Sequence, residues 1–288
     1  MITRKKFGTG TLILAILLVS IALVPAVSAI DNRLDTKENN TDNIHCAEKD
    51  IISKLSSNQS SSENLKKAEE LRDKIKAQNE QEISDSVNKS TSKQLLTLST
   101  VTLGTDATFT SADSGDSGTS LWGVAPCSKG SDYSTSSKRA REAVLTGPGG
   151  YGGGGAWAWV GKSFSVSGSD SRSANIRMSG HLYGLTSAAA GGSSSSDVVL
   201  VLRDSTTGTS YSTSIYSESC GGLGWETVDQ YFNRGLSVTL QGGHSYIAYL
   251  KITGSASTYG IGEAGSDFGP WDGDDEGYIN YSSISIDF

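Results

Sequence analysis

Histidine and cysteine are scarce in this sequence, with three of each among 288 residues. None of them falls in an H-x-H, H-E-x-x-H or C-x-x-C spacing, the patterns that bring imidazole or thiolate ligands to one transition metal. The sequence also lacks a G-x-S-x-G turn, which would present a serine nucleophile. These absences exclude the motif-defined metalloenzymes and serine hydrolases, and they leave no evident reaction centre.

Long apolar runs are missing as well, apart from one near the N-terminus. Three basic residues at positions 4–6 precede the uncharged stretch 12–24, and small residues follow as far as Ala29. This order of segments is that of a secretory signal peptide. We expect cleavage after Ala29, with an uncleaved signal anchor as the alternative. After cleavage the chain has no membrane span, and we expect it to be secreted or held at the cell surface.

No complete phosphate-binding loop is present, although residues 161–163 read Gly-Lys-Ser. The pattern Gly-x-x-x-x-Gly-Lys-Ser needs a further glycine where this chain has Ala156. The bulky residues 157–160 suit a strand, and we interpret the glycine-rich run 147–155 as a mobile connection into it. We therefore expect no nucleotide, and at a formal net charge of −7 no nucleic acid, as a partner.

Composition divides the chain into three stretches. Residues 1–29 are the signal peptide, and residues 30–95 contain no glycine and no aromatic residue. Residues 96–288 hold all five tryptophans and are rich in glycine. Within the middle stretch, residues 60–83 have capping-box spacing and a narrow apolar stripe, which predict a helix. We interpret residues 30–95 as a helical or polar spacer; a pro-segment, a stalk or an oligomerising helix are the alternatives.

The C-terminal stretch has the two-residue period of half-buried strands. Ile176, Met178 and Leu182 alternate with polar residues, so one face is expected to be buried. Residues 236–240 and 246–252 repeat the pattern on either side of a glycine turn, which predicts a hairpin. About eight to ten such strands without a convincing helix predict an all-β domain, a β-sandwich with a jelly-roll-like arrangement.

The three cysteines agree with export. Cys127 and Cys220 lie in the β stretch, and we expect a disulfide between them in an oxidising compartment. Buried, inert thiols are the alternative. The remaining Cys46 lies in the polar stretch, where it can link two chains into a dimer.

Tryptophans in or beside glycine-rich segments are the candidate ligand-binding residues: Trp157, Trp159, Trp225 and Trp271. Their rings either present a stacking face to a sugar or bury themselves against the sandwich. Trp157 and Trp159 are two residues apart and share one strand face. This pair is the leading candidate for a stacking platform.

These features predict an exported, non-catalytic binding or adhesion module whose ligand is a carbohydrate or another surface polymer. A secreted polysaccharide-degrading hydrolase is one alternative, since carboxylates distant in sequence can meet in the fold. Glu218, Glu226 and Asp229, which flank Trp225, are then the candidate acids. A structural component of the cell envelope is the other alternative.

An acidic loop follows Trp271. Asp272, Asp274 and Glu276 occupy alternate positions and precede a glycine, which resembles the D-x-D-x-D-G opening of an EF-hand-type calcium loop. The position of the bidentate glutamate is Ser283 here, so the resemblance implies a calcium loop and not an EF-hand fold. We expect a structural Ca²⁺ at these three carboxylates, with an unliganded acidic turn as the alternative.

Calcium should raise the melting temperature of the domain. Carboxylates held in one turn repel each other, and a cation that binds only the folded state stabilises it by mass action. Millimolar Ca²⁺ should act more strongly than Mg²⁺, which prefers a smaller octahedral site. Replacing Asp272 and Asp274 by asparagine should abolish the shift. Equal melting temperatures in calcium and in chelator would show that the loop is only an acidic turn.

Overall fold

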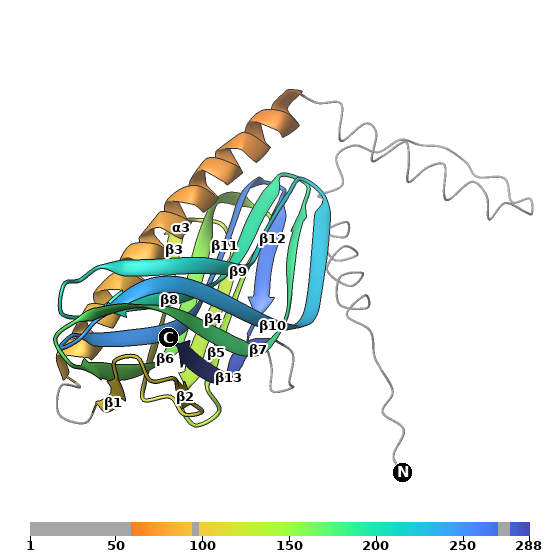
Figure 1. The fold of residues 1–288 in the computed structure, drawn as a ribbon. Helices are drawn as coiled ribbons and strands as arrows, with labels where there is room; N and C mark the ends of the chain where they lie inside the picture. The colour runs from red at the N-terminus through yellow and green to blue at the C-terminus, as the bar shows by residue number, and fades with distance from the viewer. Residues whose placement is uncertain (1–58, 94–97, 270–276) are drawn as a thin grey trace, which may run out of the picture. The chain divides into compact units, whose positions relative to one another are not determined.

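The computed structural model describes residues 59–93, 98–269 and 277–288, all within one compact unit, Asn58–Phe288 (Figure 1). The signal segment, Cys46, Trp271 and the three acidic residues of the expected calcium loop lie outside the described residues. The elements are α3 (Gln59–Lys93), β1 (Ser99–Thr102), β2 (Ala107–Phe109), β3 (Ser114–Gly123), β4 (Cys127–Ser134), β5 (Arg139–Thr146), β6 (Gly150–Ser167), β7 (Ser171–Ala189), β8 (Gly192–Asp204), β9 (Ser210–Gly221), β10 (Gly224–Gln241), β11 (Ser245–Gly260), β12 (Glu263–Phe268) and β13 (Tyr278–Asp287).

The strands form two sheets, named sheet A and sheet B here. Sheet A has the order β1-β6-β11-β8-β9, with β3 also paired to β6. Sheet B has the order β10-β7-β12-β5-β13-β2, with β4 also paired to β5 and β13 to β7. From β7 onward the chain crosses between the sheets repeatedly. The predicted jelly-roll-like β-sandwich is confirmed.

The hydrophobic core lies between the two sheets. Ile176, Met178 and Leu182 of β7 are fully buried, as their two-residue period predicted. They belong to one cluster with Leu200 and Leu250 of sheet A. Burying such a side chain contributes about 1.5–3 kcal/mol, so the facing rows of the two sheets supply the main stabilisation of the sandwich.

The hairpin predicted for residues 236–252 does not form. Leu240 belongs to β10, which pairs with β7 in sheet B. Leu250 belongs to β11, which pairs with β6 and β8 in sheet A. The turn at residues 242–244 therefore joins the two sheets. A two-residue period shows which face of a strand is buried, but it does not identify the partner strand.

Helix α3 packs on the outer face of sheet A, against β11, β6, β3 and β8 (Figure 1). Ile83 and Val87 are buried in a cluster with Trp157 and Trp159. The interpretation of this helix as part of a spacer is thereby corrected. The apolar stripe of α3 is narrow, but Trp157 and Trp159 of β6 provide a large apolar surface for it to pack against. A pro-segment role for residues 30–95 stays a prediction.

The glycine run belongs to strand β6 and allows α3 to approach the sheet. A Cβ atom added at Gly155 would lie 2.5 Å from Oδ1 of Asn79 and 2.7 Å from Cγ2 of Ile75. One added at Gly153 would lie 2.3 Å from a backbone oxygen of β11. Both glycines are buried. The expectation of a mobile connection was wrong, because residues 150–155 belong to strand β6. Their missing side chains leave room for the helix.

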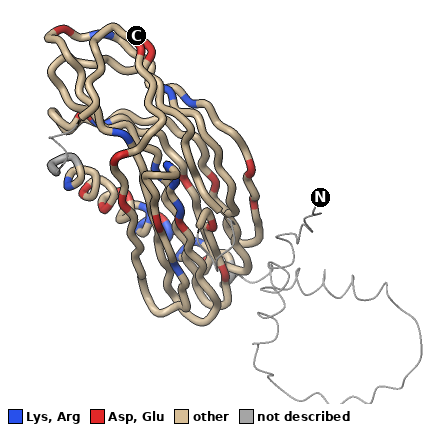
Figure 2. The backbone as a smooth tube through the Cα atoms, turned by 90° about the horizontal axis from the view of Figure 1, so that it is seen from below, with Lys and Arg blue, Asp and Glu red and all other residues tan. Residues whose placement is uncertain are grey.

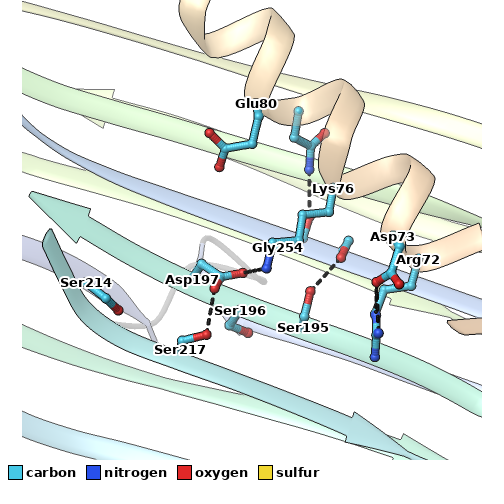
Figure 3. Close-up of polar contacts among 12 residues, drawn as sticks. Arg72, Asp73, Lys76, Glu80, Ser195, Ser196, Asp197, Ser214, Ser217 and Gly254 are labelled. Atoms are coloured by element: carbon cyan, nitrogen blue, oxygen red, sulfur yellow. Dashed lines mark hydrogen bonds and ion pairs between the residues drawn. The ribbon is translucent and has the colours of Figure 1, made fainter. Parts of the chain in front are cut away.

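Polar groups join α3 to the sheet beside this apolar contact. Nζ of Lys76 lies 2.7 Å from Oδ2 of Asp197 on β8, and Figure 3 marks this ion pair. The buried amide of Asn79 donates a 3.0 Å hydrogen bond to the carbonyl oxygen of Gly254. Lys251 of β11 forms an ion pair with Glu80. These directional contacts fix the position of the helix along the strands.

Cys127 and Cys220 are free thiols, so the expected disulfide is contradicted. Cys127 lies in β4 of sheet B and Cys220 in β9 of sheet A. The thiol of Cys220 faces the carbonyl oxygen of Thr186 at 3.4 Å. Burial raises the pKa of Cys127 to about 11 and also raises the pKa of Cys220. Both match the alternative of inert thiols.

A carboxyl group lies in the interior between the sheets. The side chain of Glu142 on β5 is completely buried and accepts a hydrogen bond from Ser266. Hydroxyl contacts of 2.6 Å continue from Ser266 to Ser196 and from Ser196 to Thr186. Burial raises the pKa of Glu142 to about 8, and the nearby charge of Asp267 adds to this effect. The group is therefore mainly protonated at neutral pH.

Glu142 should make the protein less stable as the pH rises from about 4.5 to about 8. Over this window the folded state binds a proton that the unfolded state has released, so the free energy of unfolding falls with pH. The slope is at most about 1.4 kcal/mol per pH unit. Glu142→Gln should remove this slope, whereas the exposed Glu226→Gln should keep it. Chemical denaturation across the window measures it, and equal slopes in both variants would contradict the account.

Candidate functional site

Trp157 and Trp159, the predicted stacking platform, lie beneath α3. They are 5% and 0% exposed. The indole N–H of Trp157 donates to Glu82 at 2.8 Å, and that of Trp159 donates to Ser86 at 3.1 Å. The prediction of a platform is corrected, and the alternative of burial holds for this pair. Period-two tryptophans indicated one shared face, but the sequence did not reveal that a distant helix covers it.

The other predicted residues do not meet in one place. Trp225 is 61% exposed at the start of β10, and Trp271 lies outside the described residues. The Gly-Lys-Ser segment continues in β6, where the ammonium of Lys162 lies 2.8 Å from a carboxylate oxygen of Asp113. These residues therefore form a strand and not a phosphate-binding loop.

A hollow on the outer face of sheet B is lined by polar and aromatic side chains. Its volume is about 440 Å³, and a second hollow of about 280 Å³ adjoins it. His181 and Tyr278 line both hollows. The further side chains around them are Arg139, Arg141, Tyr183, Asp229, Tyr231, Asn280 and Ser282.

Strand register explains why these side chains meet. Tyr231 of β10 and Asn280 of β13 are both paired with His181 of β7, one on each side. In the next row, Asp229 and Tyr278 flank Tyr183 in the same way. Since every second residue of a strand points to the same face, both rows lie on the outer face. The core residues of β7 have the opposite parity.

His181 is held by two hydrogen bonds. Its Nε2 lies 2.8 Å from Oδ1 of Asp229, and its Nδ1 lies 3.0 Å from the hydroxyl oxygen of Tyr278. A carboxylate only accepts, so Nε2 donates to Asp229, and in the neutral ring Tyr278 donates to Nδ1. With both nitrogens engaged, the imidazole is a fixed wall of the hollow and has no free position for proton transfer to a substrate.

Tyr231 gives the hollow an exposed ring. Its side chain is 86% exposed, the highest value among the large hydrophobic and aromatic side chains of the described residues. The centroids of the Tyr231 and His181 rings are 4.5 Å apart. The neighbouring imidazole therefore supports one side of the ring, and the remaining surface is open to solvent. Such a ring offers an apolar face with little loss of side-chain freedom on binding.

Guanidinium groups line the opposite side. Arg141 on β5 is anchored by Asp132 of β4, with Nε 2.7 Å from Oδ1. This ion pair raises the pKa of Arg141. Arg139 lies two residues away and lines the same hollow. The site thus combines fixed N–H donors on one side with an exposed aromatic ring on the other.

The carboxylates proposed for a hydrolase do not converge here. Asp229 points to the outer face, whereas Glu226 has the opposite parity on the same strand. Glu218 lies on β9 in the other sheet, and together with Glu226 it acts electrostatically on Cys220. Asp229 instead holds His181. The arrangement is suited to binding and does not resemble a pair of glycosidase acids.

The sequence did not reveal this site, because His181 belongs to no metal-binding or catalytic motif. The sequence shows that residues 229 and 231 lie on the same face of a strand, but it does not show that this strand pairs with β7. Tyr278 follows the acidic loop and carries no motif of its own. The register of three strands, which the sequence does not specify, assembles the hollow.

Neither the protein-family models nor the curated proteins gave a match to this chain. One solved structure is similar, that of TmCBM61 in complex with beta-1,4-galactotriose, with a TM-score of 0.18 and 13% sequence identity. The match covers 57% of this chain and 89% of that chain. A likeness at this level carries no ligand over to the present chain.

Over residues 59–93, 98–269 and 277–288, no group of three or more His, Cys, Asp and Glu side chains is placed to hold a metal ion. The same ranges contain no helix with the length and apolar character needed to cross a membrane. The expected calcium site falls in the gap before Gly277 and stays a prediction.

Proposed function

We propose that the chain is an exported, non-catalytic binding module that holds a glycan, or a chemically similar surface polymer, on the outer face of sheet B. The observation that carries the proposal is the exposed ring of Tyr231 beside a hollow lined by fixed hydrogen-bonding groups. The proposed location outside the cytoplasm rests on the signal-like residues 1–29.

The chemistry of the hollow suits a polyhydroxylated ligand. A sugar ring has an apolar C–H face, which packs on an aromatic ring, and hydroxyl groups around its edge. The guanidinium of Arg139 supplies donors for those hydroxyls, while Asp229 supplies acceptor oxygens. Binding sites of this kind combine aromatic surface with a few placed polar groups, which set the specificity.

The arrangement favours an extended ligand over a single small molecule. The two hollows adjoin through His181 and Tyr278, so they form one path across β10, β7 and β13. Trp225 lies on the same face of β10, six residues or about 20 Å from Tyr231. A polymer that follows the strand would reach it, although Trp225 does not line either hollow.

Tyr231→Ala should weaken binding of the full chain to its glycan at least tenfold, which corresponds to about 1.4 kcal/mol. A screen against immobilised cell-wall and plant polysaccharides identifies the ligand, and calorimetry then compares the variants. Asp229→Asn, which keeps the size of the side chain but weakens the anchor of His181, should show a smaller loss.

Tyr211→Ala is the matched control, because Tyr211 is an exposed tyrosine on β9 of sheet A. It should bind as the unaltered protein does, and all variants should keep the same melting temperature. Unchanged binding in Tyr231→Ala would reject this face as the site. Retention of no polysaccharide by the unaltered chain would reject the proposed ligand class.

A further inference from the structure

Arg139 on β5 has an unpaired guanidinium at the hollow on the outer face of sheet B. Its side chain is half-buried and lines the larger hollow. Its Nε atom is shielded from solvent and has no hydrogen-bond partner within residues 59–93, 98–269 and 277–288. A charged group that is partly removed from water loses hydration free energy, which only an acceptor or an opposite charge restores. The guanidinium is therefore able to bind an acceptor that the described chain does not supply.

The other arginines in the part of the chain that the structure describes are either engaged or exposed. Ion pairs or side-chain hydrogen bonds engage Arg72, Arg141, Arg177 and Arg203. Arg172 and Arg234 are exposed, so water hydrates them. Within this set, Arg139 alone combines partial burial with an unpaired guanidinium.

Positive charge exceeds negative charge on the side of the hollow where Arg139 lies. The ammonium of Lys138 donates to two backbone carbonyl oxygens at 2.9 and 3.3 Å, and these partners are uncharged. The second is the carbonyl of Ser282, which lines the smaller hollow. Asp132 neutralises Arg141. The charges of Lys138 and Arg139 remain, so this side of the hollow is locally basic.

The neighbouring carboxylates of the described residues do not neutralise Arg139. At the level of the hollow the strands lie in the order β10, β7, β13 and β5. Neighbouring strands are about 4.8 Å apart, so β10 lies about 14 Å from β5. Asp229 of β10 is therefore remote from Arg139, and His181 engages it. Asp267 on β12 lines neither hollow and accepts a hydrogen bond from the N–H of Gly269 at 3.2 Å.

We infer that the ligand of this face is an acidic glycan whose anionic group pairs with Arg139. The inference rests on the proposed function and names the class of glycan. A guanidinium binds an anionic oxygen group through two parallel hydrogen bonds. The carboxylates of uronic acids and the sulfate esters of sulfated sugars both have this chemistry.

Attraction by the molecule as a whole does not favour such a ligand. The formal net charge of the chain is −7, so a polyanion is repelled at long range. Figure 2 shows blue and red segments interspersed along the described chain, and in this view they do not gather into one basic region. Binding of an acidic glycan therefore depends on a local contact, which Arg139 provides.

Tyr231 and Arg139 stand at the two ends of one row across the four strands. Asn280 is paired with Arg139, and His181 lies between Asn280 and Tyr231. The span of about 14 Å between the outer strands is longer than one sugar ring. The acidic unit is therefore not the unit that packs on Tyr231 but a later one along the glycan.

Matched acidic and neutral forms of the same polysaccharide test the inference on the full chain. Polygalacturonate, alginate and hyaluronan are each compared with their carboxyl-reduced form, and dextran sulfate is compared with dextran. For the polymer that binds, the acidic form should bind about tenfold or more tightly than its neutral form, and this preference should decrease with salt. The two kinds of pair distinguish a carboxylate from a sulfate. Chelator is present throughout, so a metal ion at the acidic residues 272–276, which lie outside the described residues, cannot bridge the polymer to the chain.

Arg139→Gln should reduce the preference for the acidic form to about threefold or less, because glutamine keeps a donor but carries no charge. Arg139→Lys should keep part of the preference, since it retains the charge without the planar fork. The matched control is Arg234→Gln, which removes an exposed charge on β10 that lines neither hollow. It should keep the full preference. Arg139→Gln should melt no lower than the unaltered chain, because an unpaired and partly buried charge does not stabilise the fold.

Two results would overturn the inference. If neutral polysaccharides bind as tightly as their acidic forms, the glycan face stands but its ligand is not acidic. If Arg139→Gln keeps the full preference for the acidic form, the anionic group is bound elsewhere. Retention of neither form of any polysaccharide would reject the proposed function itself, and the inference with it.

Discussion

The packing of α3 on sheet A depends on the missing side chains at Gly153 and Gly155. A Cβ atom at Gly155 would overlap Asn79, and this asparagine donates the buried hydrogen bond to Gly254. With the glycines in place, the helix lies close enough to cover Trp157 and to bury its own apolar stripe. The glycine-rich strand, the buried tryptophans and the polar helix thus form one interdependent layer.

This layer decides which surfaces remain for function. Sheet A is covered on its outer side by α3 and on its inner side by the core. Trp157 and Trp159 are therefore buried. Among the described residues no helix covers the outer face of sheet B, and strand register places Tyr231, His181 and Tyr278 there together. The fold therefore exposes an outer face on which hydrogen-bonding groups lie beside an exposed aromatic ring.

The sequence predicted the sandwich because a two-residue period reports directly which side chains are buried, as Ile176 and Met178 show. It did not predict strand partners, so residues on either side of the turn at 242–244 were assigned to one hairpin although they belong to different sheets. The same limit hid the candidate site, since pairing of distant strands brings His181 to Tyr278. The exposure of Trp157 was predicted wrongly for a related reason. The ring is covered by α3, about 75 residues earlier in the chain. A local sequence pattern does not reveal a contact with so distant a segment.

Native-state hydrogen exchange of the full chain tests the central claim, that α3 is part of the folded layer, most directly. If the helix and sheet A form one cooperative unit, the amides of residues 65–87 open with the same free energy as those of β6 and β11, because both are released only by global unfolding. Exchange of the helix amides orders of magnitude faster than those of the strands would contradict the account. It would show α3 to be a separable cover over an accessible tryptophan face.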